Sequence, residues 1–321
     1  MIAPADTRIF SATTFAFVEA NQSAVANLLG RPKPDGGGDS FTNIDPAHGE
    51  PGRVWAQVEG AALSVGPIPA GAAFRVDTGG VQGGVDADVG AGARFGVALG
   101  YDHDALRDSA GGRSSADVFR ASLYASQAVG TVGFSEVVSY ARGSVTTDRA
   151  TGLGFGVASF GSNEWTEAVQ ASAPFALSGV EVSPSAGVTF SQLSSDAFSE
   201  TDGLSSAFAV SGAGRSLNIV SPYVIVGLSH AFVTGDGVII TPDASVGYRY
   251  DDAPRGQSFT LKAADATLFD AVRVAEDGGS ALLGLSLTAH KGAWSGYVEY
   301  RGQLANGWDD EGGRIGFRYA F

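Results

Sequence analysis

The sequence has no cysteine and a single methionine among its 321 residues. The absence of cysteine excludes a disulfide scaffold, a cysteine-bound zinc site and a cysteine nucleophile. Charged residues are sparse, at 17%, against about 25% in an average soluble domain. Asp and Glu (34) outnumber Lys and Arg (20), which argues against a nucleic-acid-binding protein with its basic face. With 44% hydrophobic residues, the chain also falls outside the disordered class.

Long apolar runs and catalytic motifs are missing as well. No stretch approaches the roughly 18 apolar residues of a transmembrane helix, and the opening MIAPADTRIF lacks the basic and apolar regions of a secretion signal. There is no G-x-S-x-G, H-E-x-x-H or P-loop motif. The histidines, which a metal site would need to bring together, are widely spaced at His48, His103, His230 and His290. We expect no enzyme, no metal site and no cofactor.

The first 30 residues differ from the rest of the chain. The stretch ADTRIFSATTFAFVEANQSAVANLLG contains one glycine, Gly30, at its end. It predicts a helix of about 22 residues that Asp6 or Thr7 could cap and that Gly30 stops. A Pro/Gly-rich segment follows, beginning RPKPDGGGDS. We therefore divide the chain into a helix at 1–30, a linker at 31–52 and a third region at 53–321.

From Arg53 onward, apolar and polar residues alternate with a period of two, which is typical of half-buried strands. In the last segment Ile315, Phe317, Tyr319 and Phe321 alternate with smaller or charged residues. We count twelve such runs, at 53–65, 72–86, 91–105, 115–129, 131–147, 160–176, 180–195, 216–233, 237–250, 278–290, 292–303 and 311–321. Short and long connections alternate between them. An even strand count with short turns on one rim and long loops on the other predicts an outer-membrane β-barrel.

A soluble β-sandwich is the main alternative, because its strands also alternate. Runs of about 11–18 residues, against about 5–6 in ordinary strands, and aromatic residues at their ends favour the barrel. Some residues fit this register poorly. Three prolines, Pro184, Pro222 and Pro242, fall inside strands, where each removes a ladder donor. Two glutamates, Glu136 and Glu167, fall on the apolar face, so either bulges or errors in the assigned register are expected there.

The alternation also predicts which charges point into the lumen, because a charge is costly against lipid. The candidates are Arg94, Arg120, Glu181, Asp243, Arg249, Glu299, Arg301, Arg314 and Arg318. They could form a salt-bridge lattice that stiffens the wall, or line a hydrophilic conduit and hold the helix through Glu19 and Asn21. Other acidic residues fall in the long connections, at Asp196, Glu200, Asp202, Asp251, Asp252, Asp265, Asp270, Glu276, Asp277, Asp309, Asp310 and Glu311. Solvation explains them, or divalent cations bridge them to lipopolysaccharide.

Several segments resemble the translocator domain of monomeric autotransporters, the type V secretion proteins. ANQSAVANLLG is similar to the helix before these barrels, and RVWAQVEGA, GGVQGGVDADVGAGARFGVALGYDHD, FSETDG, SPYVIVGLSHAF, ITPDASVGYRY and GGRIGFRYAF are similar to their strands. The resemblance implies a twelve-stranded antiparallel transmembrane β-barrel with an N-terminal α-helix threaded through its lumen. It also implies a passenger domain in cis that is exported to the cell surface of a Gram-negative bacterium.

The resemblance implies partners too: outer-membrane lipid, lipopolysaccharide, periplasmic chaperones and the barrel-assembly machinery, but no nucleic acid. The terminal stripe of Ile315, Phe317, Tyr319 and Phe321 resembles the signal that the assembly machinery recognises. Some relatives cleave their passenger by asparagine cyclisation inside the barrel, but the paired Asn motif of that subset is absent around Asn21. A small diffusion channel is the alternative function, although a porin needs no helix before its first strand.

Overall fold

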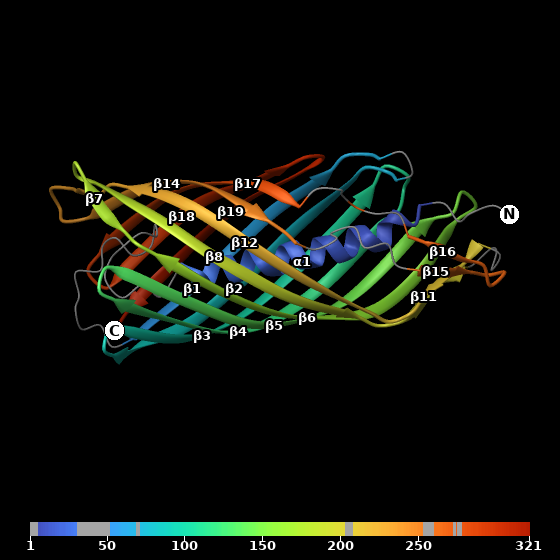
Figure 1. Ribbon diagram of the computed structural model, residues 1–321, viewed down its shortest axis with the longest axis horizontal. Helices are drawn as coiled ribbons and strands as arrows, with labels where there is room; N and C mark the ends of the chain where they lie inside the picture. Colours follow the sequence, from blue (N-terminus) through green and yellow to red (C-terminus); the bar gives the residue numbers. More distant parts are fainter. Residues whose placement is uncertain are drawn as a thin grey trace.

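The computed structural model describes residues 6–30, 52–68, 71–202, 208–252, 260–271, 274 and 278–321. It is an elongated β-barrel with one helix lying inside it along the barrel axis (Figure 1). The helix, α1 (Arg8–Leu29), has 22 residues and ends at Gly30, as expected. Thr7 is the N-cap residue but its side chain makes no capping hydrogen bond, so the expectation of a side-chain cap from Thr7 is wrong. No helix of the described residues is long and apolar enough to span a membrane.

Twelve long antiparallel strands form the wall. They are β1 (Gly52–Val65), β2 (Phe74–Gly90), β3 (Ala93–Asp108), β4 (Arg113–Val129), β5 (Val132–Ala150), β6 (Phe155–Ser172), β8 (Val180–Ser195), β12 (Arg215–Ser229), β14 (Ile239–Tyr250), β17 (Gly279–Lys291), β18 (Trp294–Ala305) and β19 (Trp308–Ala320). Each pairs with the next along the chain, and β1 pairs with β19. The wall therefore closes on itself and leaves no open edge, which is what a sheet needs in lipid. The predicted fold class is confirmed.

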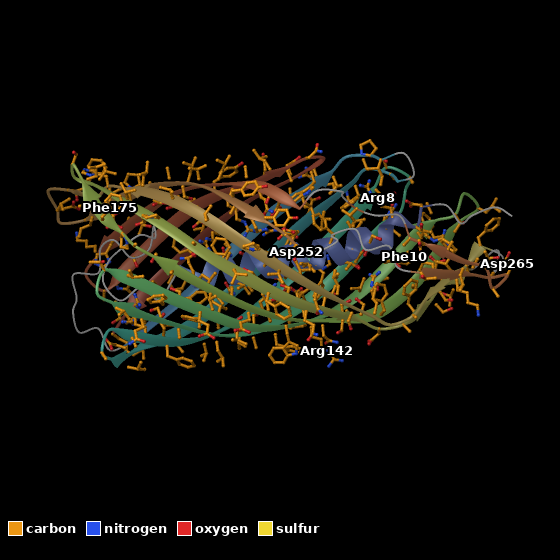
Figure 2. All side chains as sticks on the ribbon, viewed as in Figure 1. Arg8, Phe10, Arg142, Phe175, Asp252 and Asp265 are labelled. Carbon is orange, nitrogen blue, oxygen red and sulfur yellow. The ribbon has the colours of Figure 1, made fainter. Side chains whose placement is uncertain are left out.

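The two faces of the wall follow the alternation in the sequence. Outward side chains such as Ile315 and Leu99 are 61% and 71% exposed, whereas inward neighbours such as Ala98 and Tyr124 are buried. Aromatic pairs lie toward both ends of the apolar band: Tyr101 and Phe119 toward the long-loop end, and Trp294 and Tyr319 at the short-turn end, with ring separations of 5.0 and 4.7 Å. Figure 2 shows side chains projecting all along the outer wall. The apolar outer face is the face that meets lipid.

The expected bulges are not found. The pairing of β5 with β4 and β6 continues without a shift past Glu136 and Glu167, and both side chains are exposed on the outer face. They lie toward the short-turn ends of their strands, where the cost of charge on a barrel falls. The prolines Pro184, Pro222 and Pro242 likewise sit in continuous register. The register shift in the described wall lies between Asp88 and Gly90 instead.

Short strands occupy the turns and loops. A small sheet of β9 (Phe198–Ser199), β11 (Val210–Gly212), β15 (Thr260–Ala263) and β16 (Leu268–Asp270) lies at the long-loop end, near the N-terminus (Figure 1). β10 (Thr201–Asp202) pairs with β6 beside it. At the other end, β7 (Phe175–Leu177) and β13 (Phe232–Val233) extend two hairpins. The sequence did not predict the small sheet, because its strands are too short to show a period.

Candidate functional site: the helix-filled lumen

The helix carries polar residues that are almost fully buried. Glu19, Asn21, Gln22 and Asn27 are 1–6% exposed, although nothing in the helix alone would shield them. It packs most closely against the wall from β4 to β6. Burying these groups is favourable only if each finds a partner, so the barrel wall has to supply those partners.

Asn21, near the middle of the helix, is held from two sides. Its Nδ2 donates to Glu164 Oε2 at 2.8 Å, and its Oδ1 accepts from Nε and Nη2 of Arg120 at 3.0 and 2.6 Å. Arg120 Nη2 also pairs with Asp102 at 2.6 Å, and Thr166 donates to Glu164 Oε1 at 3.0 Å. We call Asn21, Arg120, Asp102, Glu164 and Thr166 the central clamp; it joins the helix to β3, β4 and β6.

A second set of contacts reaches the opposite wall. Glu19 accepts from Arg249 Nη2 at 2.8 and 2.9 Å, and Arg249 Nε lies 3.2 Å from Asp251. Asn27 donates to Glu59 at 2.8 Å. The helix is therefore attached to β14 and β1 as well as to the wall it packs against, and each contact uses a charged acceptor or donor, the stronger kind of hydrogen bond.

The long-loop end closes over the first turns of the helix. Arg8 donates to the carbonyl oxygens of Gly66, Ala72 and Val274 at 2.9, 2.5 and 2.6 Å. The ring of Phe10 stacks on Phe198 of β9 at 4.6 Å. These contacts belong to an apolar cluster of helix, wall and loop residues that includes Ile9, Phe15, Val65, Phe74, Val210, Leu261, Val274 and Trp308. The loops thus form a lid whose core is completed by the helix.

A buried ion pair ties the lid to the wall. Arg149 binds Glu200 through two bonds of 2.8 and 2.7 Å, both side chains being 0% exposed. The expectation that the acidic loop residues are solvated is therefore wrong for Glu200, and also for Asp251, which is 2% exposed. Asp309, Asp310 and Glu311 are part of β19 and not of a loop. Asp196, Asp252, Asp265 and Asp270 are exposed, and Glu276 and Asp277 lie outside the described residues.

The predicted lumen candidates are distributed along the inner wall. Arg94 pairs with Asp86 at 2.9 Å, together with Arg53 at 2.8 Å. Arg314 pairs with Glu299 at 2.5 Å. Hydrogen bonds to serine hydroxyls join Arg318 to Ser295 at 3.1 Å and Glu181 to Ser183 at 3.1 Å. Asp243 and Arg301 are partly buried. Of the nine, Arg120 and Arg249 donate hydrogen bonds to side chains of the helix.

Sequence reasoning missed several partners of these groups. The missed residues are Asp102, Glu164, Arg53, Arg149 and Glu200. The first four are 0–1% exposed, and Glu200 is 6% exposed with a fully buried side chain. The first four lie on the inward face of strands whose outward neighbours are apolar or exposed. Inward parity applied to every predicted run would have found Asp102, Glu164 and Arg53. Arg149 lies two residues beyond the run predicted at 131–147, and Glu200 lies between two very short strands that carry no period.

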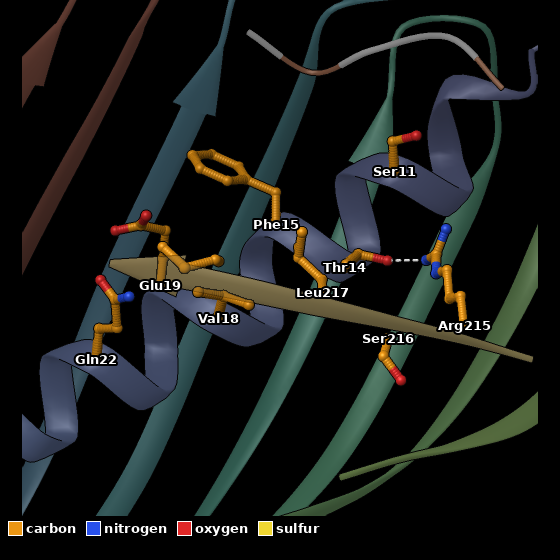
Figure 3. A pocket seen from close by; sticks show the side chains of 10 residues that line it. Ser11, Thr14, Phe15, Val18, Glu19, Gln22, Arg215, Ser216 and Leu217 are labelled. Atoms are coloured by element: carbon orange, nitrogen blue, oxygen red, sulfur yellow. Dashed lines mark hydrogen bonds between the residues drawn. The ribbon is translucent and has the colours of Figure 1, made fainter. Parts of the chain in front are cut away.

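Space remains beside the helix. A cavity of about 220 Å³ separates it from β14, β17 and β18 and is lined by Glu19, Tyr223, Arg249, Arg301 and Gln303, among others. A smaller cavity of about 70 Å³ lies nearer the lid, where Arg215 donates to Thr14 (Figure 3). The lumen is therefore polar and only partly filled. Within the described ranges, no group of three or more His, Asp or Glu side chains is arranged to hold a metal ion.

The terminal strand presents its apolar stripe outward. Ile315, Phe317 and Phe321 are 61%, 52% and 62% exposed, and Tyr319 packs on Trp294. The backbone of Phe321 exchanges two hydrogen bonds with Gly52, at 2.9 and 3.2 Å, where the last strand meets the first.

A closed twelve-stranded wall with a lipid-facing exterior, clamped around a polar helix, defines an outer-membrane barrel whose pore holds a polypeptide segment. A sequence model of the family described as "Autotransporter beta-domain" matches residues 54–301. The chain belongs to this family. It is an outer-membrane translocator domain of a Gram-negative bacterium, a transport barrel and not an enzyme, and the family implies a passenger domain in cis.

Solved structures agree on the fold. The translocator domain of autotransporter NalP from Neisseria meningitidis superposes with a TM-score of 0.75 at 15% identity, covering 98% of this chain and 99% of that chain. The β-domain of the Bordetella autotransporter BrkA gives 0.62 at 16% identity, covering 84% and 99%. The transport unit of AIDA-I from Escherichia coli gives 0.55 at 11% identity, covering 87% and 93%. No curated protein sequence matches the chain.

Proposed function

We propose that α1 is the trailing part of an exported polypeptide and stays in the lumen as the anchor of the passenger. In this arrangement residues 1–30 are the lumenal linker helix, 31–52 connect it to the wall, and 53–321 form the translocator. The observation that carries the proposal is the central clamp. A helix with a buried Asn21 bonded to Glu164 and Arg120 is built for this lumen, because outside it these groups would lose their charged partners.

The predicted lumen charges would serve both export and retention. The partly filled interior is lined by charges of both signs, and the predicted lumen residues are Arg94, Arg120, Arg249, Arg301, Arg314, Arg318, Glu181, Asp243 and Glu299. We infer that these groups form a polar conduit of mixed sign for an extended chain, and that Arg120 and Arg249 bind the helix after export. Charged groups in a water-filled lumen keep their hydration, so such a conduit does not oppose a polar polypeptide.

The test is display of a reporter in cells. A small reporter domain is fused ahead of residue 1, behind a secretion signal, and its exposure is measured by protease treatment of intact cells. We expect digestion of the reporter in cells that make the fusion, and protection in cells that make the reporter and signal without the barrel. A reporter that stays protected while the barrel is inserted would overturn the export proposal and favour the diffusion channel.

We further propose that the barrel-assembly machinery recognises the terminal stripe of Ile315, Phe317, Tyr319 and Phe321, after delivery by periplasmic chaperones. Three of these side chains are exposed on the outer face, and strand addition at an open edge is a general way to read such a segment. Before closure, β19 has an open edge that β1 later occupies. Recognition at this stage would couple assembly to the same hydrogen bonds that close the wall.

A further inference from the structure

The arginines on the outside of the barrel are confined to one region. Among the described residues, the outward-facing arginines are Arg75, Arg107, Arg113 and Arg142, which lie on the four consecutive strands β2 to β5. All four are exposed, and Figure 2 shows Arg142 on the outer wall. The other described arginines of the wall point inward. An acidic chain of net charge −14 thus carries its outward arginines on one third of its wall.

Three of these arginines are direct neighbours across the sheet. Arg75 of β2 pairs in register with Arg107 of β3, and Arg107 pairs in register with Arg113 of β4. Side chains directly opposite each other on one face have Cβ atoms about 5 Å apart, and like charges there are destabilising. We call Arg75, Arg107 and Arg113 the arginine row.

Protein carboxylates neutralise this row only in part. Arg75 binds Asp77 at 2.9 Å, in a pair whose side chains are 58% and 57% exposed. Asp148 is the register partner of Arg113, but the two side chains do not form an ion pair. In the described part of the chain, neither Arg107 nor Arg113 has a hydrogen-bonded acidic partner. Two adjacent guanidinium groups therefore retain donors for an external anion, and planar guanidinium groups suit phosphate oxygens well.

The row lies above the membrane's aromatic girdle on the long-loop side. Tyr101 and Phe119 are paired in register on β3 and β4, and their rings are 5.0 Å apart. Arg107 follows Tyr101 by six residues (101 to 107), and Arg113 precedes Phe119 by six (113 to 119). With about 3.3 Å per residue and a strand tilt near 40°, the row is about 15 Å beyond the girdle. The row therefore lies outside the apolar band, on the side of the outer leaflet.

A hollow of about 760 Å³ adjoins the row at the rim. Its lining includes Arg75, Arg107 and Ser109, apolar residues such as Phe74 and Leu304, and the carboxylate of Asp309. Guanidinium donors beside apolar and hydroxyl-accepting groups suit a phosphorylated sugar of a glycolipid better than a bare ion, which Asp309 would repel.

We propose that the arginine row is a binding site for a phosphate group of lipopolysaccharide, the phosphorylated glycolipid of the outer leaflet. The phosphate accepts hydrogen bonds from Arg107 and Arg113 and offsets the repulsion within the row. The site rests on the outer-membrane location of the barrel and is independent of passenger export. It differs from cation bridging to acidic loops, because it needs direct arginine contacts and no divalent ion.

The test uses the full chain refolded in detergent and titrated with purified diphosphorylated lipid A in the presence of a chelator, binding being followed by native mass spectrometry. We expect the Arg75→Ser/Arg107→Ser/Arg113→Ser variant to bind at least about tenfold more weakly than the parent, since charge-assisted bonds to phosphate are strong. Dephosphorylated lipid A should bind the parent as weakly as it binds the variant, and inorganic phosphate at equal concentration should not compete. The control variant Lys262→Ser/Lys291→Ser, which removes two exposed positive charges elsewhere on the protein, should bind like the parent.

Equal binding by parent and triple variant, or by phosphorylated and dephosphorylated lipid A, would overturn the proposal and leave only apolar contact with the acyl chains. Competition by inorganic phosphate would show a general anion site and overturn the assignment to a lipid. If the triple variant does not fold, the single variant Arg107→Gln decides, with about a threefold loss or more expected from removing one charge-assisted donor group. Reporter display, measured in the same variants, should be unchanged, so a failure of export is distinguishable from a failure of lipid binding.

Discussion

Asn21 of the helix and Glu164 of β6 are joined by a 2.8 Å hydrogen bond between residues 143 positions apart in the chain. Glu164 is 1% exposed, and its second oxygen accepts from Thr166. The carboxylate therefore depends on groups from both the wall and the helix. Arg120 donates to the oxygen of the same Asn21 side chain. The Asn21 amide therefore lies between an acceptor, Glu164, and a donor, Arg120, and only one orientation of the amide forms both hydrogen bonds. Several predictions about retention of the helix rest on this geometry.

Replacing Arg120 should destabilise the barrel strongly. The variant Arg120→Ala leaves Asp102, 1% exposed, without its ion-pair partner, and an unpaired buried charge costs about 3–5 kcal/mol. We expect a loss of about 3 kcal/mol in the free energy of unfolding, measured by urea unfolding in detergent micelles. The control is Asp236→Ala, which removes an exposed pair with Lys291 at 3.7 Å and should change the free energy of unfolding little, because solvent screens exposed ion pairs. Equal effects of the two substitutions would contradict the central clamp.

The Glu19–Arg249 pair should show energetic coupling. Both side chains are largely buried, at 6% and 12% exposure, so removal of either one takes a charged partner away from the other, although Arg249 keeps Asp251 at 3.2 Å. A double-mutant cycle of Glu19→Ala and Arg249→Ala should give a coupling energy of about 1–3 kcal/mol, the upper range for contacting residues. Thermal unfolding of the four proteins in the same detergent measures it. Additive effects would mean that the pair does not help to retain the helix.

Removal of the helix should open the pore. Deleting residues 1–30 takes away the side chains that fill the lumen beside β4 to β6, and single-channel conductance in planar bilayers should rise clearly above that of the full chain. The unfolding temperature should fall because the clamp loses its partners. The wall itself should persist, since its hydrogen bonds are between strands, and unheated samples should still migrate differently from boiled ones on a denaturing gel. If the two proteins conduct equally, the helix does not fill the pore, and the diffusion-channel function is favoured.

Deletion of Phe321 should impair assembly in cells more than folding in detergent. Its ring is 62% exposed, so little packing is lost, although two backbone bonds to Gly52 disappear. We expect a several-fold drop in membrane-inserted protein and a refolding yield close to that of the parent. The control is Leu177→Ala, which truncates a side chain of nearly equal exposure. It should change neither the amount of membrane-inserted protein nor the refolding yield. A parallel loss in cells and in detergent would mean that Phe321 contributes to stability alone.

Asp6, at the lid end of the helix, should make stability depend on pH. Burial, followed by the effect of the neighbouring Asp108 carboxyl group, raises the pKa of Asp6 from 3.8 to about 7. The folded state thus holds a proton that the unfolded chain releases, so the stabilisation is complete below pH 4 and is lost as the pH rises toward 7. The variant Asp6→Asn should unfold at the parent's temperature at low pH and at a higher temperature at pH 8. Asp196→Asn, at an exposed acidic residue, is the control; a pH profile that Asp6→Asn leaves unchanged would contradict the assignment.

The order of residues along the chain was sufficient to predict the wall. A period of two is visible in the order of neighbouring residues, because one face of each strand is apolar and the other is not. The twelve strands, their two faces and the helix before them could therefore be identified without tertiary information. The boundaries were less accurate: the run expected at 160–176 is β6, Phe155–Ser172, because the polar ends of long strands outside the membrane are not distinguished from loops by hydropathy.

The contacts that define the lumen were decided by tertiary structure. Alternation shows that Arg120 and Arg249 point inward, but only closure of β1 on β19 fixes which wall faces which side of the helix. The partner of Asn21 is Glu164 and the partner of Glu19 is Arg249, at separations of 143 and 230 residues. The lid was equally beyond local reasoning, because Phe198, Glu200 and Val274 lie in segments with no period. Phe198 and Val274 contact an apolar cluster that includes residues of the helix, and Glu200 is buried against Arg149 of the wall. Periodicity is a property of neighbouring residues, whereas the pairing of charges across a barrel depends on register, closure and the depth of the helix in the lumen.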